Sequence, residues 1–561
     1  MTQERTFGER ATKGFAWNYF YKITEFGLMN LYTILVVRHF GPAISAPYAV
    51  FTALCTTIAM VAAFAVDGVL LRYIQRISVN ASSTNDELTN IESSGLRGFL
   101  KTLFAFRILV VSVVSLLVAV GFFFLSNLFP SLFPALNSLG GFIPYLIIFL
   151  FAQSVIAFCT FSLVGLFETK RVFIASLISR SILMACGLIF VLGGILSLRY
   201  AIFLFVASAM INAIVLLFAL RKEIDHHAPP NRPTVRFPIS SFMRKWWELI
   251  SHPKQIKLLL ATPLMLYGIT TWGSDILSTV LGRQPDILMM RAMLGESPQI
   301  GFYLSASIVL LVTEYIFLFG LGGTLVSIFS KLAHDDEQEH DGLLFPRLAR
   351  ARTEIAGFQN VVLLPLCAYM MVFAPDVMRS VYGSKYDEAI PMIRIGLVAL
   401  VLSVGIFGGG MQITSLVAIG RERLVFRNRL FWGITNLAAN FFLIRMYGGI
   451  GAMIGTQFAN AFACGAEGYF ARKIIGGNVF DVIATSRIFL IAGIAAFTGY
   501  FLVSIIVPSG NPPMNAVIGI AICGIITTLL YIILKVPEAK KLWQRMQLLF
   551  QQSKFSRFAH D

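Results

Sequence analysis

The dominant feature of this 561-residue sequence is a succession of long apolar stretches separated by short polar segments. Each stretch is long enough for a bilayer-spanning helix, which needs roughly 20 mostly apolar residues. Only 13% of the residues are charged, whereas soluble domains carry roughly 25%. Because backbone in lipid must satisfy its own hydrogen bonds, each stretch is expected to be an α-helix. The sequence therefore predicts an all-α polytopic membrane protein with about 14 transmembrane helices, at 16–37, 48–72, 103–125, 142–167, 172–196, 200–220, 261–282, 302–330, 355–374, 390–418, 425–444, 449–471, 484–507 and 515–536.

Basic residues are distributed unevenly between alternate loops. With the N-terminus inside, 33 of the 45 lysines and arginines fall in inside segments and 7 in outside loops. Cytoplasmic loops carry the excess of basic residues, so both termini and the segment 221–257 are predicted to be cytoplasmic. The net charge of +16 is interpreted as loops that face anionic lipid. Nucleic-acid binding is not expected, because no polar folded domain gathers the basic residues.

Two inside segments carry more than a short turn. The segment 221–257 contains eight basic residues together with Trp246 and Trp247, a pattern typical of an amphipathic helix at the membrane interface. The C-terminal segment mixes basic and apolar residues in the same way and is expected to anchor at the membrane surface. The predicted parts are an N-terminal six-helix lobe 1–220, a linker 221–260, a C-terminal six-helix lobe 261–475, two additional helices 476–536 and an amphipathic tail 537–561.

The two predicted lobes repeat each other in sequence. Ser162-Leu163-Val164-Gly165 recurs 253 residues later as Ser415-Leu416-Val417-Ala418, and Arg38 and Arg291 are related by the same shift. Six spans per lobe would bring both lobes into the membrane in the same direction. Parallel repeats of this kind surround a central cavity and rock about a site near the bilayer midplane, which is the arrangement we expect.

The first apolar stretch carries a polar face. Asn18, Lys22, Glu25 and Met29 are spaced by four, three and four residues, which places them on one side of a helix. A charged residue in hydrocarbon costs about 2.5 kcal/mol or more, so this face is expected to avoid lipid. One interpretation is structural: Lys22 and Glu25 pair, or Lys22 reaches the membrane surface. The other is that the face lines a transport cavity, in which case Asn18, Lys22 and Glu25 are candidate substrate-binding residues.

Other ionisable residues lie deep in predicted spans. Arg180 in the fifth span is a candidate for binding a pyrophosphate with Lys22. Asp275 in the seventh span, Glu314 in the eighth and Asn436 in the eleventh are candidate ion-coupling residues. This distribution suits an anionic substrate held by the first half and a proton or cation held by the second. The alternative for each acid is a structural role, in which it is protonated or hydrogen-bonded to a neighbour.

Three further arginines lie about four residues from a span end, where snorkelling accounts for a charge; they are Arg107, Arg394 and Arg487. The six cysteines fall inside apolar stretches without CxxC spacing. We therefore expect neither disulfides nor a metal site.

Several short motifs lie between about residue 10 and residue 475. They are Lys13-Gly14-x-x-Trp17, Arg38-x-Phe40-Gly41-Pro42, Tyr48-Ala49, Asp67-Gly68, Leu294-Gly295, Ile300-Gly301-x-Tyr303, Phe373-Ala374-Pro375, Tyr382-Gly383-x-x-Tyr386-x-x-Ala389, Asn436 and Tyr447-Gly448-x-x-Gly451-Ala452. Together these motifs resemble the polysaccharide transport (Wzx-type oligosaccharide flippase) family of the multidrug/oligosaccharidyl-lipid/polysaccharide exporter superfamily.

The resemblance implies a transporter rather than an enzyme. It implies movement of a lipid-linked oligosaccharide, usually on polyprenyl pyrophosphate, from the cytoplasmic to the outer leaflet of a bacterial inner membrane for cell-surface polysaccharide or lipopolysaccharide biosynthesis. The expected partners are this lipid, anionic membrane lipids and a polysaccharide polymerase or other assembly component. No cofactor is expected apart from a coupling proton or sodium ion.

Two alternatives remain open. A cation-coupled multidrug exporter of the same superfamily would favour acids in the first half, against which Lys22 and Arg180 argue. A membrane enzyme, such as an oligosaccharide polymerase or glycosyltransferase, would usually need a sizeable outside loop for catalytic residues. The longest outside loops here have about 15–20 residues, and none of them clusters carboxylates with histidine.

Overall fold

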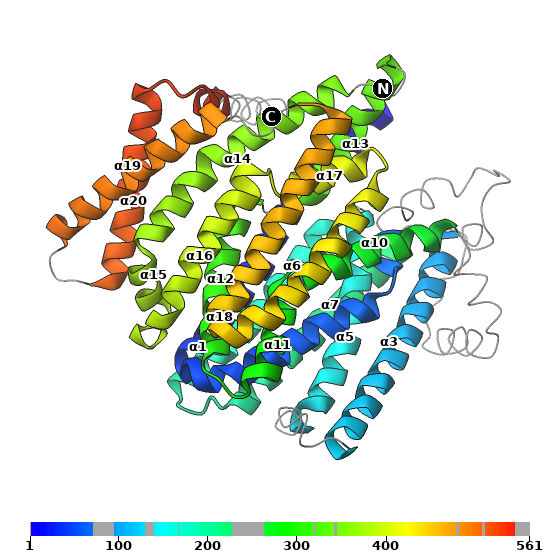
Figure 1. Cartoon of the computed structure of the whole chain (residues 1–561). Helices are drawn as coiled ribbons and strands as arrows, with labels where there is room; N and C mark the ends of the chain where they lie inside the picture. The colour runs from blue at the N-terminus through cyan, green and yellow to red at the C-terminus, as the bar shows by residue number, and fades with distance from the viewer. Residues whose placement is uncertain are drawn as a thin grey trace, which may run out of the picture. The chain divides into compact units, whose positions relative to one another are not determined.

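The computed structural model describes residues 2–70, 74, 95–128, 140–166, 168–226, 263–318, 321–340, 345–477, 482–507 and 511–544. Every regular element in these ranges is a helix (Figure 1), which confirms the all-α prediction. Ten helices in the described ranges are long and apolar enough to cross a membrane. The predicted interfacial helix of the linker and most of the predicted tail lie outside the described residues.

The chain divides into two compact units, Met1–Gly301 and Phe302–Asp561. This division falls after the seventh predicted span, whereas the sequence places the lobe boundary in the linker 221–260. The predicted lobe boundaries therefore stay predictions. In the first unit the helices are α1 (Thr2–Ala63), α3 (Gly95–Leu128), η1 (Gly140–Phe142), α5 (Ile143–Gly165), α6 (Thr169–Leu192), α7 (Leu198–His226), α10 (Pro263–Val280) and α11 (Arg283–Leu294).

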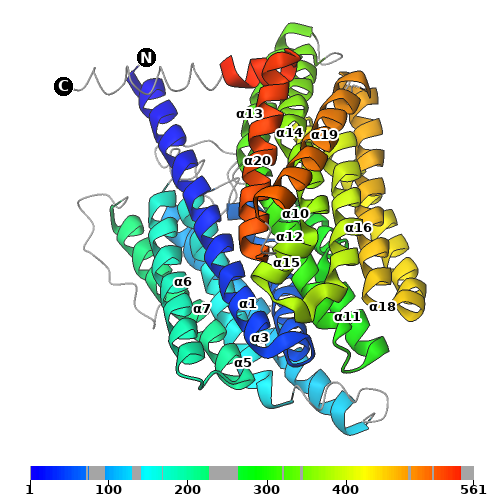
Figure 2. The same cartoon turned by 90° about the vertical axis from the view of Figure 1, so that its left-hand side faces the viewer.

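The helix α1 contains the first predicted span and the greater part of the second, separated by a kink at Gly41. Figure 2 shows its first part as a long helix beside α6 and α7. Close approach of α1 and α6 requires a small residue, and Gly187 provides it, because a Cβ there would lie 2.8 Å from Cε2 of Tyr32. The hydroxyl of Tyr32 in turn donates to the carbonyl of Ala201 on α7 at 2.8 Å. The helix α1, which carries the predicted polar face, is thus fixed against α6 and α7.

The helices α10 and α11 pack with the first unit rather than with the second. The indole nitrogen of Trp272 donates to the carbonyl of Met60 at 3.0 Å, and its ring meets Phe64 edge to face at 4.8 Å between centroids. A Cβ at Gly268 would lie 2.4 Å from the carbonyl oxygen of Ala65. Asp275, on α10, therefore belongs to the first compact unit, whereas the sequence placed it in the second half.

The helix α12 (Gln299–Leu318) begins in the first unit and continues into the second. The eighth predicted span is divided between α12 and α13. The other helices of the second unit are α13 (Leu321–His340), α14 (Pro346–Val372), α15 (Ala374–Val381), η2 (Ser384–Ala389), α16 (Ile390–Leu400), the π-helix η3 (Val401–Ile406), α17 (Gly410–Ala418), α18 (Glu422–Ile475), α19 (Val482–Ile506) and α20 (Pro512–Ile533).

The eleventh and twelfth predicted spans form one continuous element, α18, which turns back on itself at Gly448 (φ +57°). The two C-terminal helices pack on α14 (Figure 1). A Cβ at Gly519 of α20 would lie 2.4 Å from the ring of Phe373, so this glycine allows α20 to approach the end of α14. The carboxylate of Glu538 accepts from Arg487 at 3.0 Å and fixes the start of α19 to the residues after α20.

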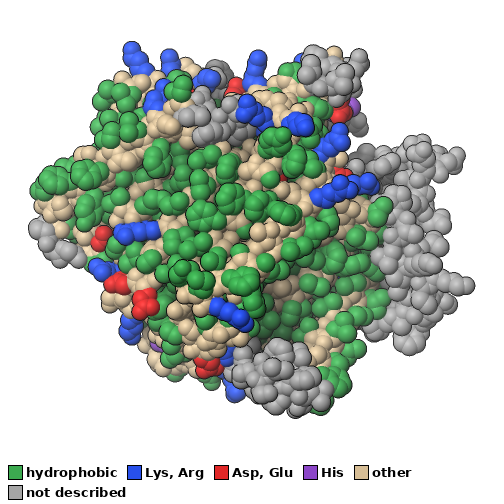
Figure 3. Space-filling model, viewed as in Figure 1, with side chains coloured by type: hydrophobic (Ala, Val, Ile, Leu, Met, Phe, Trp, Pro, Cys, Tyr) green, Lys and Arg blue, Asp and Glu red, His purple; other side chains and the backbone are tan. Residues whose placement is uncertain are grey.

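Hydrophobic side chains are widespread on the face seen in Figure 3, and Lys and Arg lie toward its upper and lower edges. Where α14 begins and α18 ends, Arg350, Arg472 and Lys473 are exposed. Apolar helix surfaces ending in exposed basic residues are typical of helices that cross lipid.

Candidate functional site

Arg180, on α6 of the first unit, forms a largely buried ion pair. Its Nη2 lies 3.9 Å from Oε1 of Glu25, with 9% and 20% of the two side chains exposed. Nη1 of Arg180 donates to the hydroxyl of Ser208 at 3.3 Å, and that hydroxyl donates to the carbonyl of Ser179 at 3.2 Å. The buried Nε of Arg180 has no hydrogen-bond partner. The guanidinium is therefore held on two sides and keeps one donor unused.

Helix packing explains this position. Since α6 packs between α1 and α7, Arg180 on α6 reaches Glu25 on one neighbour and Ser208 on the other. Tyr21, one turn before Glu25, is 5% exposed and lies close enough to the carboxylate of Glu25 for the two groups to interact. The carboxylate of Glu25 consequently interacts with both Tyr21 and Arg180.

Lys22 does not form the ion pair with Glu25 that one sequence interpretation expected. Among the described side chains no acid pairs with Lys22, whose Nζ lies 5.0 Å from the ring centroid of Tyr21. The reason is that Arg180 reaches Glu25 from the neighbouring helix. Lys22 and Asn18 are both partly buried. Lys22 and Glu25 lie one turn apart on α1, and Arg180 reaches Glu25 from α6. These three residues, which we call the α1–α6 cluster, carry two positive charges and one negative charge.

Such a cluster can bind an anion. A cation with a spare buried donor forms charge-assisted hydrogen bonds with phosphate oxygens, and an ammonium on a flexible stem can add a second charge. Glu25 compensates only one of the two positive charges. The remaining positive charge would attract a negatively charged phosphate. The α1–α6 cluster therefore carries one more positive charge than negative charge.

The Asp275 carboxylate lies on α10 and is exposed. Asp67 is close enough for the two charges to interact. Geometry supports this proximity, because a Cβ at Gly68, next to Asp67, would lie 2.3 Å from the hydroxyl of Thr271, one turn before Asp275. Among the described residues, no side chain pairs with the carboxylate of Asp275.

The described hydroxyl groups near Asp275 do not donate hydrogen bonds to its carboxylate. A purely structural role would require such hydrogen bonds. Thr271 donates to the carbonyls of Tyr267 and Gly268, Ser274 to that of Thr270, and Ser278 to that of Ser274. Ser and Thr hydroxyls in helices commonly bond back to their own turn. Asp275 is consequently an accessible carboxylate whose charge interacts with that of another acid.

Asp67 itself is paired with Arg107 of α3. Only 2% of the Arg107 side chain is exposed, so the sequence interpretation of Arg107 as snorkelling is wrong. A snorkelling arginine extends to the membrane surface, whereas Arg107 is buried against an acid of a neighbouring segment. Arg487 is bonded to Glu538, and Arg394 is exposed and donates to the carbonyl of Met371.

Glu314 and Asn436 lie in the second unit and differ in their surroundings. Glu314 is partly buried and interacts electrostatically with the thiols of Cys367 and Cys464. Asn436 is fully buried within a network in which Asn440 donates to its Oδ1 at 3.2 Å and Thr456 donates to the same atom at 3.0 Å. This network joins the two arms of α18, so a structural role accounts for Asn436.

A second buried ion pair escaped the sequence interpretation. Arg429 donates to both carboxylate oxygens of Glu467 at 2.6 and 3.0 Å, with exposed fractions of 6% and 0%. The two residues are 38 apart, and Gly448 lies midway between them in the sequence. Asn440 and Thr456, which are 16 apart, are also centred on Gly448. Treating Gly448 as the tip of a helical hairpin would have predicted both pairings.

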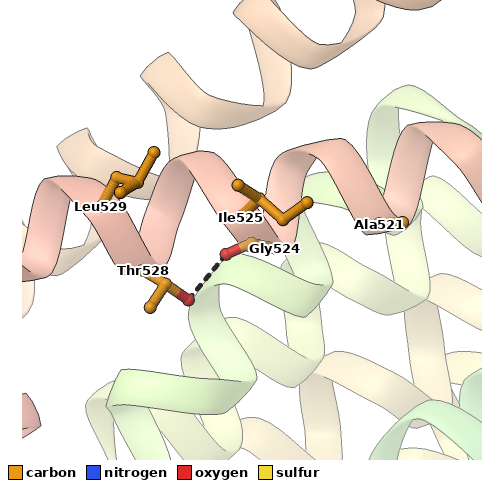
Figure 4. Close-up of a pocket in the computed structure, with 5 residues that line it drawn as sticks. All are labelled: Ala521, Gly524, Ile525, Thr528 and Leu529. Atoms are coloured by element: carbon orange, nitrogen blue, oxygen red, sulfur yellow. Dashed lines mark hydrogen bonds between the residues drawn. The ribbon is translucent and has the colours of Figure 1, made fainter.

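A surface depression on α20 is lined by Ala521, Gly524, Ile525, Thr528 and Leu529 (Figure 4). All five residues lie on one helix, and the hydroxyl of Thr528 donates to the carbonyl of Gly524 at 2.8 Å. The depression therefore presents mainly apolar atoms, and we assign it no binding role.

No family model matches the chain, and no curated protein matches its sequence. Solved structures match it along most of its length. A structure of the lipid II flippase MurJ in an inward closed conformation has a TM-score of 0.55 and 16% identity, covering 92% of this chain and 98% of that one. An inward-facing multidrug resistance MATE transporter of the MOP superfamily has a TM-score of 0.55 and 14% identity, covering 82% and 95%.

A MOP superfamily transporter from Pyrococcus furiosus has a TM-score of 0.53 and 14% identity, covering 82% of this chain and 95% of that one. Identities in this range show the fold alone. The chain has the fold of MOP superfamily transporters and is a multi-pass membrane protein.

Proposed function

We propose that this protein is a flippase that moves a lipid-linked oligosaccharide of the polyprenyl-pyrophosphate type from the cytoplasmic to the outer leaflet of a bacterial inner membrane. The α1–α6 cluster carries the proposal, because it combines a buried Arg180 that retains an unused donor with a Lys22 that no described acid neutralises. A pyrophosphate crossing a membrane needs desolvated cations. A polyprenyl tail can remain in lipid meanwhile, so the protein needs to handle only the polar headgroup.

The fold does not separate a lipid flippase from a drug exporter, since matched structures of both kinds have TM-scores of 0.55. The charge of the site is what supports a flippase over a drug exporter. In the Pyrococcus furiosus transporter, a reversed polarity of the binding pocket suggests a different function for that protein. An exporter of cationic drugs would favour net negative charge, whereas the α1–α6 cluster has one more cation than anion. Net positive charge supports an anionic substrate here.

The proposed energy source is a proton or sodium gradient. Asp275 is an accessible carboxylate near Asp67, and no described side chain pairs with it, whereas Asp67 is paired with Arg107. Uptake of a cation would relieve repulsion between the two acids. Glu314 is the alternative coupling residue in the second unit. Both termini are proposed to lie in the cytoplasm, where the basic loops face anionic lipids, and an oligosaccharide polymerase or other assembly component is the proposed protein partner.

Binding of defined lipids to the purified protein tests the substrate class. The probes are a polyprenyl pyrophosphate carrying one sugar, the matching monophosphate and the matching uncharged polyprenol, measured by native mass spectrometry. We expect the pyrophosphate lipid to bind most tightly and Lys22→Ala to weaken it by about tenfold, since losing one charged hydrogen bond costs about 1.5 kcal/mol.

The matched control is Lys385→Ala, which removes an exposed lysine of η2 in the other unit and should leave binding unchanged. Glu25→Gln is expected to tighten pyrophosphate binding, because it removes the negative charge that competes for Arg180. Equal affinity of the parent protein for all three lipids would contradict the proposed substrate class.

A further inference from the structure

The helix α14 has a backbone interruption that a side chain from α20 repairs. Pro365 lies inside α14 and has no N–H group with which to bond the carbonyl of Val361, four residues earlier. The hydroxyl of Tyr531 on α20 donates to this carbonyl at 2.9 Å. In a membrane, where water is not at hand, a carbonyl freed by proline needs such a partner. A helix beyond the twelve spans of the predicted lobes thus completes the hydrogen bonding of a lobe helix.

A second interruption lies in the neighbouring segment that runs from α16 to α17. The π-helix η3 (Val401–Ile406) is followed by Gly408 and Gly409 at φ +79° and +51° before α17 begins. Residues with a side chain rarely adopt such φ values, so the glycines permit the break. Two of the carbonyls at the break are bonded by side chains. Asn360 of α14 donates to the carbonyl of Gly405 at 2.9 Å.

The buried side chain of Gln412 bonds the second of these carbonyls. Gln412 donates to the carbonyl of Phe407 at 2.9 Å, and its own oxygen accepts from Arg352 at 2.6 Å. Arg352 also donates to the carbonyls of Ala471 and Gly476 at the end of α18, at 3.3 and 2.8 Å. Hydrogen bonds from side chains of α14 and α17 therefore stabilise the break.

The two interruptions meet. A Cβ at Gly405 would lie 2.8 Å from Cδ2 of Leu364, the residue before Pro365. Val361 and Leu364 belong to one buried hydrophobic cluster with Ile488 of α19, and Val401 of η3 and Tyr531 of α20 pack against that cluster. Both interruptions and both C-terminal helices therefore lie at one level of the second unit.

Apolar packing differs on the two sides of this level. On one side, a cluster that includes Leu348, Met411 and Ile475 has described members from α13, α14, α17 and α18. On the other side, a cluster that includes Phe373, Ala495 and Cys523 has members from α14, α19 and α20. Packed blocks separated by a proline and a π-helix are where helical segments bend.

We propose that Pro365 and the Gly408–Gly409 break together form one hinge across the second unit, and that Tyr531 is a positioning residue that stiffens it. The two C-terminal helices thereby acquire a role, because α20 provides the hydrogen bond that keeps α14 intact at its proline. The hinge lets the α13–α17 block tilt relative to the α15–α19–α20 block during transport. This inference concerns motion within one unit and does not depend on the identity of the substrate.

Pulsed electron paramagnetic resonance between labels at Ser330 (α13) and Ser384 (η2) tests the hinge, in a background with the six native cysteines replaced. Both positions are exposed and lie in the second unit. We expect two distance populations in the parent protein. Tyr531→Phe should raise the minor population about tenfold, because it leaves the Val361 carbonyl without a donor.

The deciding comparison is the same substitution in a Pro365→Ala background. Alanine restores an N–H for the Val361 carbonyl, so Tyr531→Phe should then leave the distance distribution unchanged. Tyr369→Phe is the matched control. It removes another α14–α20 hydrogen bond, from Tyr369 to the carbonyl of Cys523 at 3.0 Å, and its effect should be the same in both backgrounds.

An equal effect of Tyr531→Phe with and without Pro365 would overturn the role of Tyr531. A single unchanged distance in every variant would overturn the hinge itself. Pro365→Ser, which also restores the N–H, replaces Pro365→Ala if the alanine variant does not fold. Loss of pyrophosphate-lipid binding with an intact distance response would count against the proposed function and leave the hinge standing.

Discussion

Arg107 and Asp67 form an ion pair between α3 and the end of the second predicted span, although 40 residues separate them in the sequence. The Arg107 side chain is 2% exposed and that of Asp67 is 22% exposed. The pair explains how an apolar helix can carry an arginine without exposing the charge to lipid. Breaking a buried pair by removing one partner is costly, because the remaining charge stays buried.

Arg107→Met should lower the free energy of unfolding in detergent by about 3 kcal/mol, as measured by denaturant unfolding. Adding Asp67→Asn should recover part of this loss, since the stranded carboxylate is then neutral. The control is Arg379→Ala, which removes an exposed pair with Asp387 and should cost about 1 kcal/mol or less. Similar losses for Arg107→Met and the control would show that the buried pair has no special weight.

Asp275→Asn should bind the lipid substrate normally and lose its response to an imposed proton or sodium gradient. The reason is that Asn keeps the shape of Asp275 but cannot take up the coupling ion. Transport in proteoliposomes with and without the gradient measures the effect. Ser278→Ala is the control, because Ser278 lies one turn away on the same helix and bonds only its own backbone. A gradient response of Asp275→Asn equal to that of the parent would exclude Asp275 as the coupling residue.

The predicted topology, which rests on the bias of basic residues, places Ser330 at the cytoplasmic end of the eighth predicted span and Asn511 in an outside loop. Single cysteines at these exposed positions should react differently with a membrane-impermeant maleimide added to intact cells. Position 511 should be labelled and position 330 protected until the cells are opened. Labelling of position 330 in intact cells would reverse the predicted orientation.

Hydropathy predicted the all-α fold because apolar length and backbone satisfaction leave a spanning segment little choice. It could not place the ends of segments that contain internal bends. The span predicted at 302–330 is divided between α12 and α13, and 390–418 contains a π-helix and a break at Gly408. Such interruptions depend on hydrogen bonds from neighbouring helices, for instance from Asn360, which hydropathy does not report.

The candidate site was predicted in part. Helical spacing placed Lys22 and Glu25 on one face of α1, and both lie in the first unit with Arg180. The sequence could not identify which cation pairs with Glu25, because that depends on how closely α6 approaches α1 at Gly187. It also missed Arg107 and Arg429, whose acidic partners lie 40 and 38 residues away. Pairing across helices requires the packing that only the structure provides.

Flipping of a fluorescent polyprenyl-pyrophosphate-linked sugar in proteoliposomes tests the central claim most directly. The protein is reconstituted with the labelled lipid, and arrival in the opposite leaflet is followed by quenching with a membrane-impermeant reagent. The parent protein and Lys385→Ala should flip the lipid at the same rate, and Lys22→Ala at least about tenfold more slowly, because it loses a charged contact with the pyrophosphate. No flipping by the parent, or flipping by Lys22→Ala at the parent rate, would contradict the account.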